Sequence, residues 1–346
     1  FLARVQAEAP IAIRPYRCRM NGLGSLPPQV CALALGMNGM SGLYAHWARI
    51  LEVNLNPLPL AYAITAVVLL AAYLAKVLTA PASAWQDLST GPGLSAVNGL
   101  PAAAQALAVR FAPPPATQGI IITSFALHIF IAARFLYVNL KQGQRPDPSW
   151  FPALLLIGMT NVTSHVAGPE SLRAFMPMHF AFLVVLYVPL MAVVAYRILL
   201  SPARDSVAPN AGMAVLMAPS SFYTLIHLSS GKPFGDGLGV VFFFLSTAFF
   251  IITIRMLFLR RHLWATAFHP SYVAFGFPFA SSATAALLAS ERLPLLAGIA
   301  VRSWAALLTI TVTGTTCIVL PRFMWMIRSC FLPASRTQTS DTKKSK

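Results

Sequence analysis

Charged residues are scarce in this chain. They make up 10% of 346 residues, whereas hydrophobic residues make up 57%; an average globular protein is about 25% charged. The mean hydropathy of +0.68 arises from apolar segments distributed over the whole length. These numbers exclude a soluble protein, a single anchor on a soluble domain and a removable signal peptide as the source of the hydropathy. The sequence predicts an integral membrane protein.

Acidic residues are the rarest of the charged ones: nine, against 25 Lys and Arg. All nine fall in predicted loops, tails or helix ends: Glu8, Glu52, Asp87, Asp147, Glu170, Asp205, Asp236, Glu291 and Asp341. A cation channel, or a carrier driven through carboxylates, usually needs an acid at membrane depth. Both classes are therefore disfavoured.

Motifs for covalent and metal chemistry are also missing. The sequence has no HExxH, GxSxG, P-loop or CxxC pattern, so we expect no enzyme, metal site or cofactor. The four cysteines give no disulfide framework. The basic runs are not interleaved with aromatic residues as in a nucleic-acid groove, and nucleic acid is not an expected partner.

Ten apolar segments are long enough to cross a bilayer. They cover residues 29–48, 58–78, 92–110, 117–138, 150–167, 175–199, 212–230, 238–259, 271–289 and 297–320. The odd-numbered segments recur about every 60 residues, which predicts five helical hairpins in a pseudo-fivefold, all-α arrangement. We expect a transmembrane domain at 28–325, preceded by a cytoplasmic segment 1–27 and followed by a cytoplasmic tail 326–346.

The odd and even segments differ in composition. The even ones are plain apolar helices, whereas the odd ones carry residues that bend or interrupt helices, namely Gly36, Pro101, Pro152, Pro219 and Pro278. The odd segments also carry polar candidates for a pore lining: Asn38, Ser41, Asn98, Thr160, Asn161, Ser220, Thr224, Ser281, Ser282 and Thr284. Such residues at membrane depth either pack helices closely or line a wet cavity. We predict inner odd helices around a pore and outer even helices.

The basic residues predict the orientation. With both termini on one side, that side receives 19 Lys and Arg and the other side six. The positive-inside rule then makes both termini cytoplasmic, in the plasma membrane. Five basic residues near the ends of even segments are expected to snorkel to the interface: Lys76, Arg134, Arg197, Arg255 and Arg322.

Three histidines occupy similar places in the repeat. His46, His165 and His227 fall near the predicted outer ends of odd segments. They are candidate pH sensors at an outer mouth, and the alternative is ordinary hydrogen-bonded histidines at the interface. Hydroxyl and amide groups below a basic surface favour an uncharged or anionic permeant.

The strongest local pattern is in the ninth segment, where Phe277 precedes Pro278. The proline cannot donate a backbone hydrogen bond, so the carbonyl of Ala274 is freed and the helix bends. The bend would direct Phe277 into a narrow pore, where an apolar ring blocks ions by dewetting. The alternative is that Phe275, Phe277 and Phe279 all serve in helix packing.

Several motifs together resemble the tellurite-resistance/dicarboxylate transporter family. They are the aromatic-Gly-Phe-Pro run at 275–278, the Asp-Pro-Ser-Trp-Phe-Pro run at 147–152 and the Ala-Pro-Ser run at 218–220, on five hairpins over about residues 28–325. The family includes plant slow-type anion channels, fungal malate permeases and sulfite pumps.

The resemblance implies a homotrimer with one pore in each protomer. It implies that Phe277 is the gate, with Gly276 where channel members have Ser. The implied partners are small inorganic or organic anions and the lipid bilayer. The function expected is thus an anion channel, and the alternative is a proton-coupled carrier or exporter for C4-dicarboxylates, sulfite or tellurite-type oxyanions.

Overall fold

The computed structural model describes residues 22–147, 149–200, 215, 217–229, 238–259 and 270–331. Within these ranges the chain is all helical and contains no strand. In chain order the elements are η2 (Leu23–Ser25), α1 (Gln29–Leu51), α2 (Pro57–Thr79), α3 (Pro81–Asp87), α4 (Gly91–Val97), α5 (Gly99–Phe111), α6 (Pro114–Lys141), α7 (Trp150–Leu155), η3 (Leu156–Gly158), α8 (Met159–Ala167), α9 (Glu170–Leu200), α10 (Met217–Ser229), α11 (Leu238–Leu259), η5 (Pro270–Phe275), α13 (Gly276–Ser290) and α14 (Leu295–Phe331).

Each predicted segment overlaps a helix or a run of short helices. We call α1, α4 with α5, α7 with η3 and α8, α10, and η5 with α13 the odd segments. The even helices are α2, α6, α9, α11 and α14. The short helix α3 was not predicted, and α14 continues to Phe331, past the expected domain boundary at 325.

Six helices of the described chain are long and apolar enough to cross a membrane. They are the five even helices and the run Tyr272–Ser290 of the ninth segment. The other odd segments do not qualify because they are interrupted, short or rich in polar residues. The all-helical membrane character expected from the sequence is confirmed at this level.

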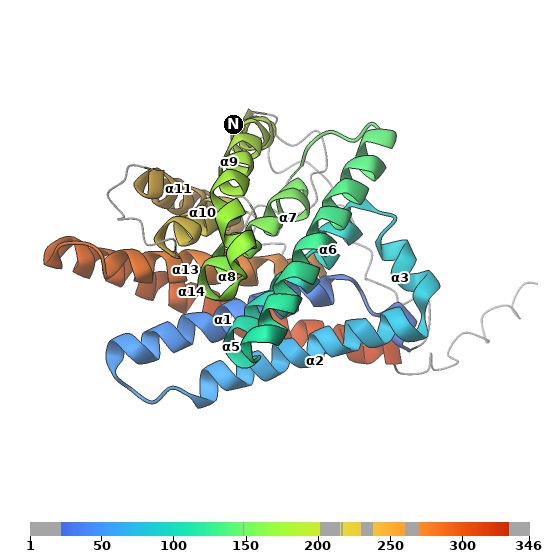
Figure 1. Ribbon diagram of the computed structural model, residues 1–346, viewed down its shortest axis with the longest axis horizontal. Coiled ribbons are helices and arrows are strands. Elements are labelled where there is room, and N and C mark those ends of the chain that lie inside the picture. Colours follow the sequence, from blue (N-terminus) through green and yellow to red (C-terminus); the bar gives the residue numbers. More distant parts are fainter. Residues whose placement is uncertain are drawn as a thin grey trace, which may run out of the picture.

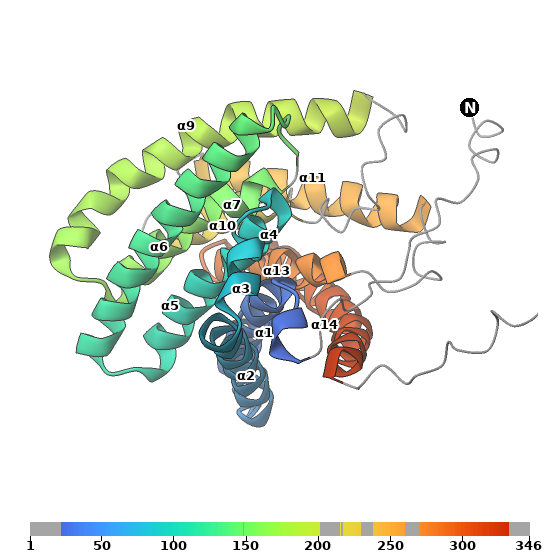
Figure 2. The same ribbon diagram turned by 90° about the vertical axis from the view of Figure 1, so that its right-hand side faces the viewer.

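The even helices surround the odd segments (Figures 1 and 2). In the apolar windows of the even helices, between 28% and 39% of the residues are buried, compared with 72% in Tyr272–Ser290. A helix in an outer layer is expected to bury only one stripe of its surface, and a helix in an inner layer is expected to bury most of it.

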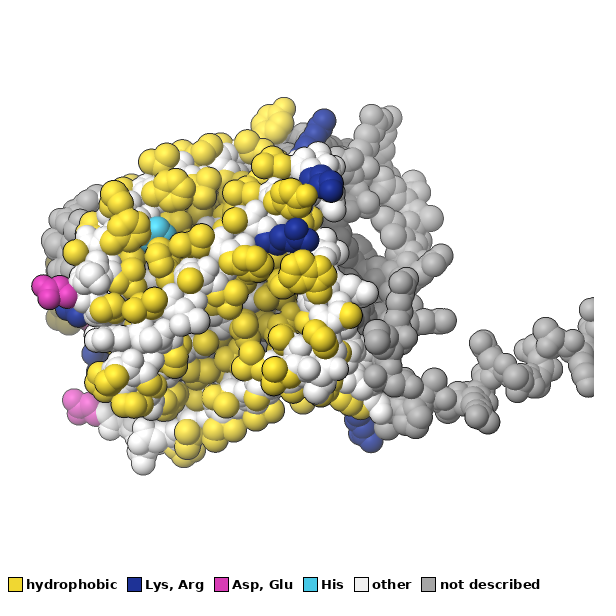
Figure 3. Space-filling model, turned by 45° about the vertical axis from the view of Figure 1, so that its right-hand side comes forward, with side chains coloured by type: hydrophobic (Ala, Val, Ile, Leu, Met, Phe, Trp, Pro, Cys, Tyr) yellow, Lys and Arg dark blue, Asp and Glu magenta, His cyan; other side chains and the backbone are white. Residues whose placement is uncertain are grey.

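The exposed surface of the even helices is apolar. Apolar side chains cover the middle of the face shown in Figure 3, and the described charged side chains lie toward its two ends. Exposed members of this belt include Ile64, Val67, Val68, Ile122, Ile129, Phe130, Phe182, Val185, Val241, Phe244, Ile251 and Ile310. An apolar surface of this extent suits a lipid environment rather than water.

Prolines mark the beginnings of helices in the odd segments. Pro101, Pro152, Pro219 and Pro278 are each the third residue of their helix, in α5, α7, α10 and α13. The first turn of a helix does not use its N–H groups, so proline is tolerated there. At Pro101 and Pro278 the expected kink is therefore a break, because α5 follows α4 and α13 follows η5. Pro152 lies in the first turn of its segment, and the residue directly before α10 lies outside the described residues.

Lys76 was expected to snorkel to the interface, and this was wrong. Its side chain is 1% exposed, and the Nζ atom donates to Oδ2 of Asp87 and to the carbonyl of Leu26, both at 2.7 Å. The Tyr73 hydroxyl also donates to Asp87, at 3.0 Å. Burial raises the pKa of Asp87, although the Lys76 ammonium and the Tyr73 hydroxyl act in the opposite direction. The pair fastens α2 to α3 and to the chain that enters α1.

Candidate functional site

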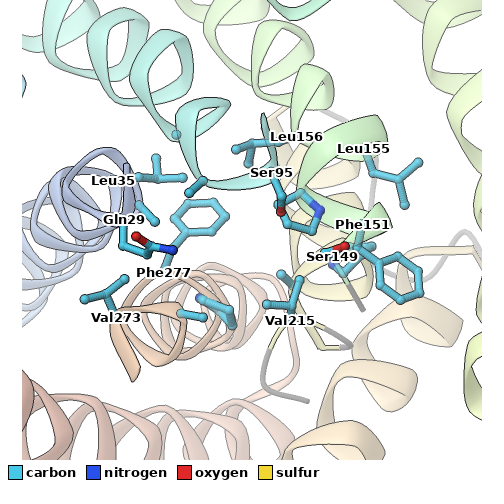
Figure 4. Close-up of a pocket in the computed structure, with 18 of the residues that line it drawn as sticks. Gln29, Leu35, Ser95, Ser149, Phe151, Leu155, Leu156, Val215, Val273 and Phe277 are labelled. Carbon is cyan, nitrogen blue, oxygen red and sulfur yellow. The ribbon is translucent and has the colours of Figure 1, made fainter. Parts of the chain in front are cut away.

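A cavity of about 200 Å³ lies among the odd segments (Figure 4). Every residue that lines it belongs to an odd segment or to the residues just before one. The lining is Gln29, Ala32 and Leu35; Pro92, Ser95, Ala96 and Gly99; Ser149, Phe151, Pro152, Leu155 and Leu156; Val215, Ala218, Pro219 and Phe222; Val273, Ala274, Phe277 and Pro278. The five odd segments therefore converge on one space, toward the N-terminal ends of their helices.

The walls of this cavity are mostly apolar. Proline rings from four odd segments contribute to it, because the helix-starting prolines lie beside it: Pro92, Pro152, Pro219 and Pro278. Side-chain amide and hydroxyl groups come from Gln29, Ser95 and Ser149. Water is held weakly in an apolar space with few polar partners, and such a space is a barrier to a hydrated ion.

Phe277 is half-buried, and its ring projects from α13 into the cavity (Figure 4). The ring lies edge-on to that of Phe222 on α10, with centroids 6.1 Å apart. On the α1 side it approaches Gly39, where an added Cβ would lie 3.7 Å from the Cδ2 atom of Phe277. Phe277 thus extends between α1 and α10 at the cavity wall.

The neighbouring phenylalanines are in a different environment. Phe275 and Phe279 are 1% and 0% exposed, and their rings contact each other with centroids 5.6 Å apart. Phe279 also contacts Phe250 of α11, at 5.5 Å. These two rings face the packing between α13 and its neighbours, as expected for side chains about 200° around the helix from Phe277.

Glycines bring α1 and α13 into backbone contact. A Cβ added to Gly36 would lie 3.3 Å from the Cα of Gly276 and 3.4 Å from the backbone nitrogen of Phe277. Small residues at a helix crossing allow this approach. Gly36 therefore has a packing role directly beside the cavity, within an unbroken α1.

The polar residues expected to line a pore fall into several groups. Asn38 Oδ1 and Thr160 Oγ1 are buried and have no hydrogen-bond partner among the described residues. Ser281 bonds Ser221 on α10, at 2.8 Å. Ser220, Thr224 and Thr284 bond carbonyls of their own helices.

Other predicted lining residues face neighbouring elements. Ser282 bonds Ser246 on α11 at 2.9 Å, and Asn161 bonds His179 on α9 at 2.9 Å. Ser41 donates to the carbonyl of Pro59 on α2. None of the ten polar candidates lines the cavity described above.

Asn98 lies at the break between α4 and α5 and belongs to a buried chain of hydrogen bonds. Its Nδ2 donates to the carbonyl of Pro152 at 2.7 Å, and its Oδ1 accepts from His128 Nδ1 at 2.7 Å. His128 Nε2 lies 3.2 Å from Nε2 of Gln105, whose Oε1 accepts from Thr163 at 3.0 Å. The chain joins the second and third odd segments to α6.

The three histidines with proposed pH sensing lie on α1, α8 and α10. His46 and His165 are half-buried, whereas His227 is 4% exposed and packs close to Gly239 of α11. Their role as sensors stays a prediction. Among the described residues, no group of three or more His, Cys, Asp or Glu side chains is arranged to hold a metal ion.

Sequence reasoning missed Phe222 and the His128 chain. Phe222 is 3% exposed, lines the cavity and contacts Phe277. Its ring also packs over Gly158, where an added Cβ would lie 3.0 Å from its Cε1 atom. Phe222 lies three residues after Pro219, whereas the residue three after Pro278 is Ser281, so no spacing in the sequence marked it. The chain matches no model of a known protein family and no curated protein.

Proposed function

We propose that this protein is an anion channel in which Phe277 closes a pathway formed by the odd segments. The observation that carries the proposal is the cavity, because all five odd segments contribute to its lining and the Phe277 ring projects into it. A single side chain at the meeting point of five segments is well placed to control passage. The proposal includes ten membrane crossings in five hairpins, with pseudo-fivefold symmetry.

The placement of the carboxylates disfavours a cation as the permeant ion. The carboxylates of the described chain lie at helix ends or in loops, so none offers a cation a site between the odd segments.

The same proposal extends to the assembly and its location. The apolar belt on the even helices suits lipid and neighbouring copies of the chain, and we propose a homotrimer with a pore in each protomer. We propose that both termini lie in the cytoplasm, on the basis of the basic residues alone, and that the protein resides in the plasma membrane.

Reversal potentials test the proposal. Purified protein in a planar bilayer under a KCl gradient should give currents that reverse near the chloride equilibrium potential. Replacement of chloride by nitrate, formate or malate on one side then ranks the permeant anions. Currents that follow the potassium gradient and ignore chloride would contradict the proposal.

A second candidate is a proton-coupled carrier for small organic or inorganic oxyanions. The buried His128 favours it, since histidine is a side chain that can bind and release a proton near neutral pH. A carrier should accumulate anion in liposomes driven by a pH gradient alone, and His128→Asn should abolish that accumulation. Discrete single-channel openings favour the channel instead.

A further inference from the structure

Aromatic and basic side chains gather at the C-terminal end of α6. The guanidinium carbon of Arg134 lies 5.4 Å from the centre of the Trp85 ring on α3 and 5.5 Å from the centre of the Tyr137 ring. The ammonium group of Lys141 lies 5.8 Å from the centre of the same Tyr137 ring. We call these four residues the α6 end cluster. Its two cations approach one aromatic ring.

The α6 end cluster lies at the edge of the apolar belt. Trp85 and Tyr137 are 54% and 56% exposed, and Leu140, next to Lys141, is exposed as well. Phe130 belongs to the belt and precedes Tyr137 by about two helical turns, which places Tyr137 on the same face of α6 and about 10 Å farther along it. Exposed Trp and Tyr side chains are typical of the level at which lipid headgroups meet the hydrocarbon.

Arg134 has hydrogen-bond donors that the protein does not use. Its Nε atom donates to the carbonyl of Leu88 at 3.3 Å, and the side chain is half-buried. Its two terminal nitrogens have no hydrogen-bond partner among the described residues. A guanidinium group can bind a phosphate through two parallel N–H···O bonds. Because the side chain is already held in place, less conformational entropy is lost when it binds.

The charge around the end of α6 is positive. Arg145, in the loop after α6, is exposed and adds a third cation. Two carboxylates are close in the chain. Asp87 is paired with Lys76 at 2.7 Å, and Asp147 accepts hydrogen bonds from the backbone nitrogen and the hydroxyl of Ser149. Three basic side chains therefore stand against one carboxylate that has no cationic partner in the described chain.

The remaining acidic residues of the described chain lie at the other ends of the helices. They are Glu52, Glu170 and Glu291. In Figure 3 the acidic side chains lie at the left-hand end of the face, whereas the right-hand end, toward which α6 runs in Figures 1 and 2, shows only basic ones among the described residues. The end of α6 is thus a surface that attracts anionic groups.

We propose that the α6 end cluster binds the phosphate group of an anionic glycerophospholipid whose acyl chains lie on the apolar belt. The phosphate accepts hydrogen bonds from the free guanidinium nitrogens of Arg134 and reduces the repulsion between Arg134 and Lys141. A zwitterionic lipid also has a phosphate, but its ammonium group is repelled by the excess of positive charge, so an anionic headgroup is preferred. The site lies on the outer surface and is independent of what passes through the protein.

Native mass spectrometry with two lipids tests the site. The purified protein in detergent is titrated with phosphatidylglycerol and with phosphatidylcholine of the same acyl chains, and the ratio of the two affinities is measured. The parent should prefer phosphatidylglycerol. Arg134→Gln and Lys141→Gln should each reduce that preference about fivefold, the factor that one basic residue near a membrane surface contributes to the attraction of anionic lipid.

Three further points separate the site from total charge and from folding. Arg328→Gln removes a guanidinium group 5.8 Å from the exposed Trp325 ring on α14, and it should keep the parental preference. Arg134→Lys keeps the charge without the paired donors, and it should retain more of the preference than Arg134→Gln. Lys141 is exposed, so Lys141→Gln serves if Arg134→Gln does not fold.

Several results would overturn the site. Equal affinity of the parent for the two lipids, or an undiminished preference in Arg134→Gln and Lys141→Gln, would show that the cluster selects no lipid. An equal loss in Arg328→Gln would show that total charge attracts the lipid. If glycerol 3-phosphate, which lacks acyl chains, displaces phosphatidylglycerol at equal concentration, the occupant is a soluble phosphate instead. None of these measurements records conductance, so their failure leaves the proposed anion channel standing.

Discussion

At the scale of single residues, Phe277 differs from its neighbours by its surroundings rather than by its type. Phe275 and Phe279 are buried in helix packing, whereas Phe277 is half-buried and meets the cavity. The ring contacts Phe222 on α10 and lies near Gly39 on α1. Because part of the ring borders the cavity, its replacement removes less packing than the replacement of a fully buried ring.

Replacement of Phe277 by Ala should open the pathway. Loss of the ring leaves a wall of small and proline residues, and we expect the basal chloride conductance in bilayers to rise at least about tenfold, a barrier change of about 1.4 kcal/mol. Phe222→Ala should raise it less, because that ring is fixed by further contacts. Phe279→Leu, a milder change in a fully buried ring, should leave the conductance at the parental level. A folded Phe277→Ala protein that conducts no more than the parent would show that the ring is not the gate.

Lys76 and Asp87 make a second prediction at this scale. Lys76→Met leaves the Asp87 carboxylate buried without its partner, and loss of one partner of a buried pair destabilises a protein by about 3–5 kcal/mol. Lys76→Met with Asp87→Leu removes both charges and should recover at least half of that loss. Thermal unfolding midpoints in detergent measure both, and a double variant no more stable than the single one would contradict the pairing.

The sequence indicated the importance of Phe277 through a neighbouring residue, whereas it misjudged the position of Lys76 because the partners of Lys76 are distant in sequence. Phe277 is marked by its neighbour Pro278, which is local information. The partners of Lys76 are Asp87, 11 residues away, and the carbonyl of Leu26, 50 residues away. Only the packing of α3 against α2 brings them together, and nothing in the sequence around Lys76 indicates that packing.

At the scale of elements, the crossing of α1 and α13 depends on two glycines. A Cβ at Gly36 would meet the backbone of α13, whereas nothing lies within 4 Å of a Cβ placed on Gly42 of the same helix. Gly36→Val should therefore destabilise the protein by about 1–3 kcal/mol through overpacking. Gly42→Val carries the same change in helix propensity without the clash and should be distinctly more stable. Equal unfolding midpoints for the two variants would contradict a close crossing.

The extents of most helices could be predicted from hydropathy, and their interruptions could not. The repeat predicted one helix over 92–110, where the structure has α4 and α5, and it gave no sign of the break at Asn98. The prolines suggested kinks, and the structure begins a helix two residues before each of four of them. A proline in a first turn and a proline at a kink have the same local sequence signature, and tertiary contacts decide between them.

At the scale of the whole molecule, the number of membrane crossings distinguishes the proposal from a count based on hydropathy. Six helices of the described chain satisfy length and hydropathy on their own, while the proposal has ten crossings. Short, polar helices cross a membrane only where neighbours satisfy their backbone groups, which is the situation of the buried odd segments. If the proposed ten crossings exist, hydropathy alone undercounts them because the inner segments are short and polar.

Cysteine labelling measures this number. In a cysteine-free background, Ala82→Cys precedes α4 and Ala112→Cys follows α5, so ten crossings place the two thiols on opposite sides of the membrane. We expect an impermeant maleimide to label them from opposite sides, with Ala112 on the extracellular face. With six crossings the whole interval between α2 and α6 lies on one side, and both thiols would be labelled together.

The contact of Gly36 with Gly276 also limits how a gate at Phe277 could work. Two helices that touch backbone to backbone cannot slide past each other without separating, and the Phe277 nitrogen is part of that contact. The movement left to the ring is rotation about its own single bonds within the cavity that it lines. Side-chain rotation is on the order of a million times faster than the rearrangement of whole helices. A pathway closed in this way would switch faster than a current recording resolves, so the parent would show a low averaged conductance rather than openings separated by long silent periods.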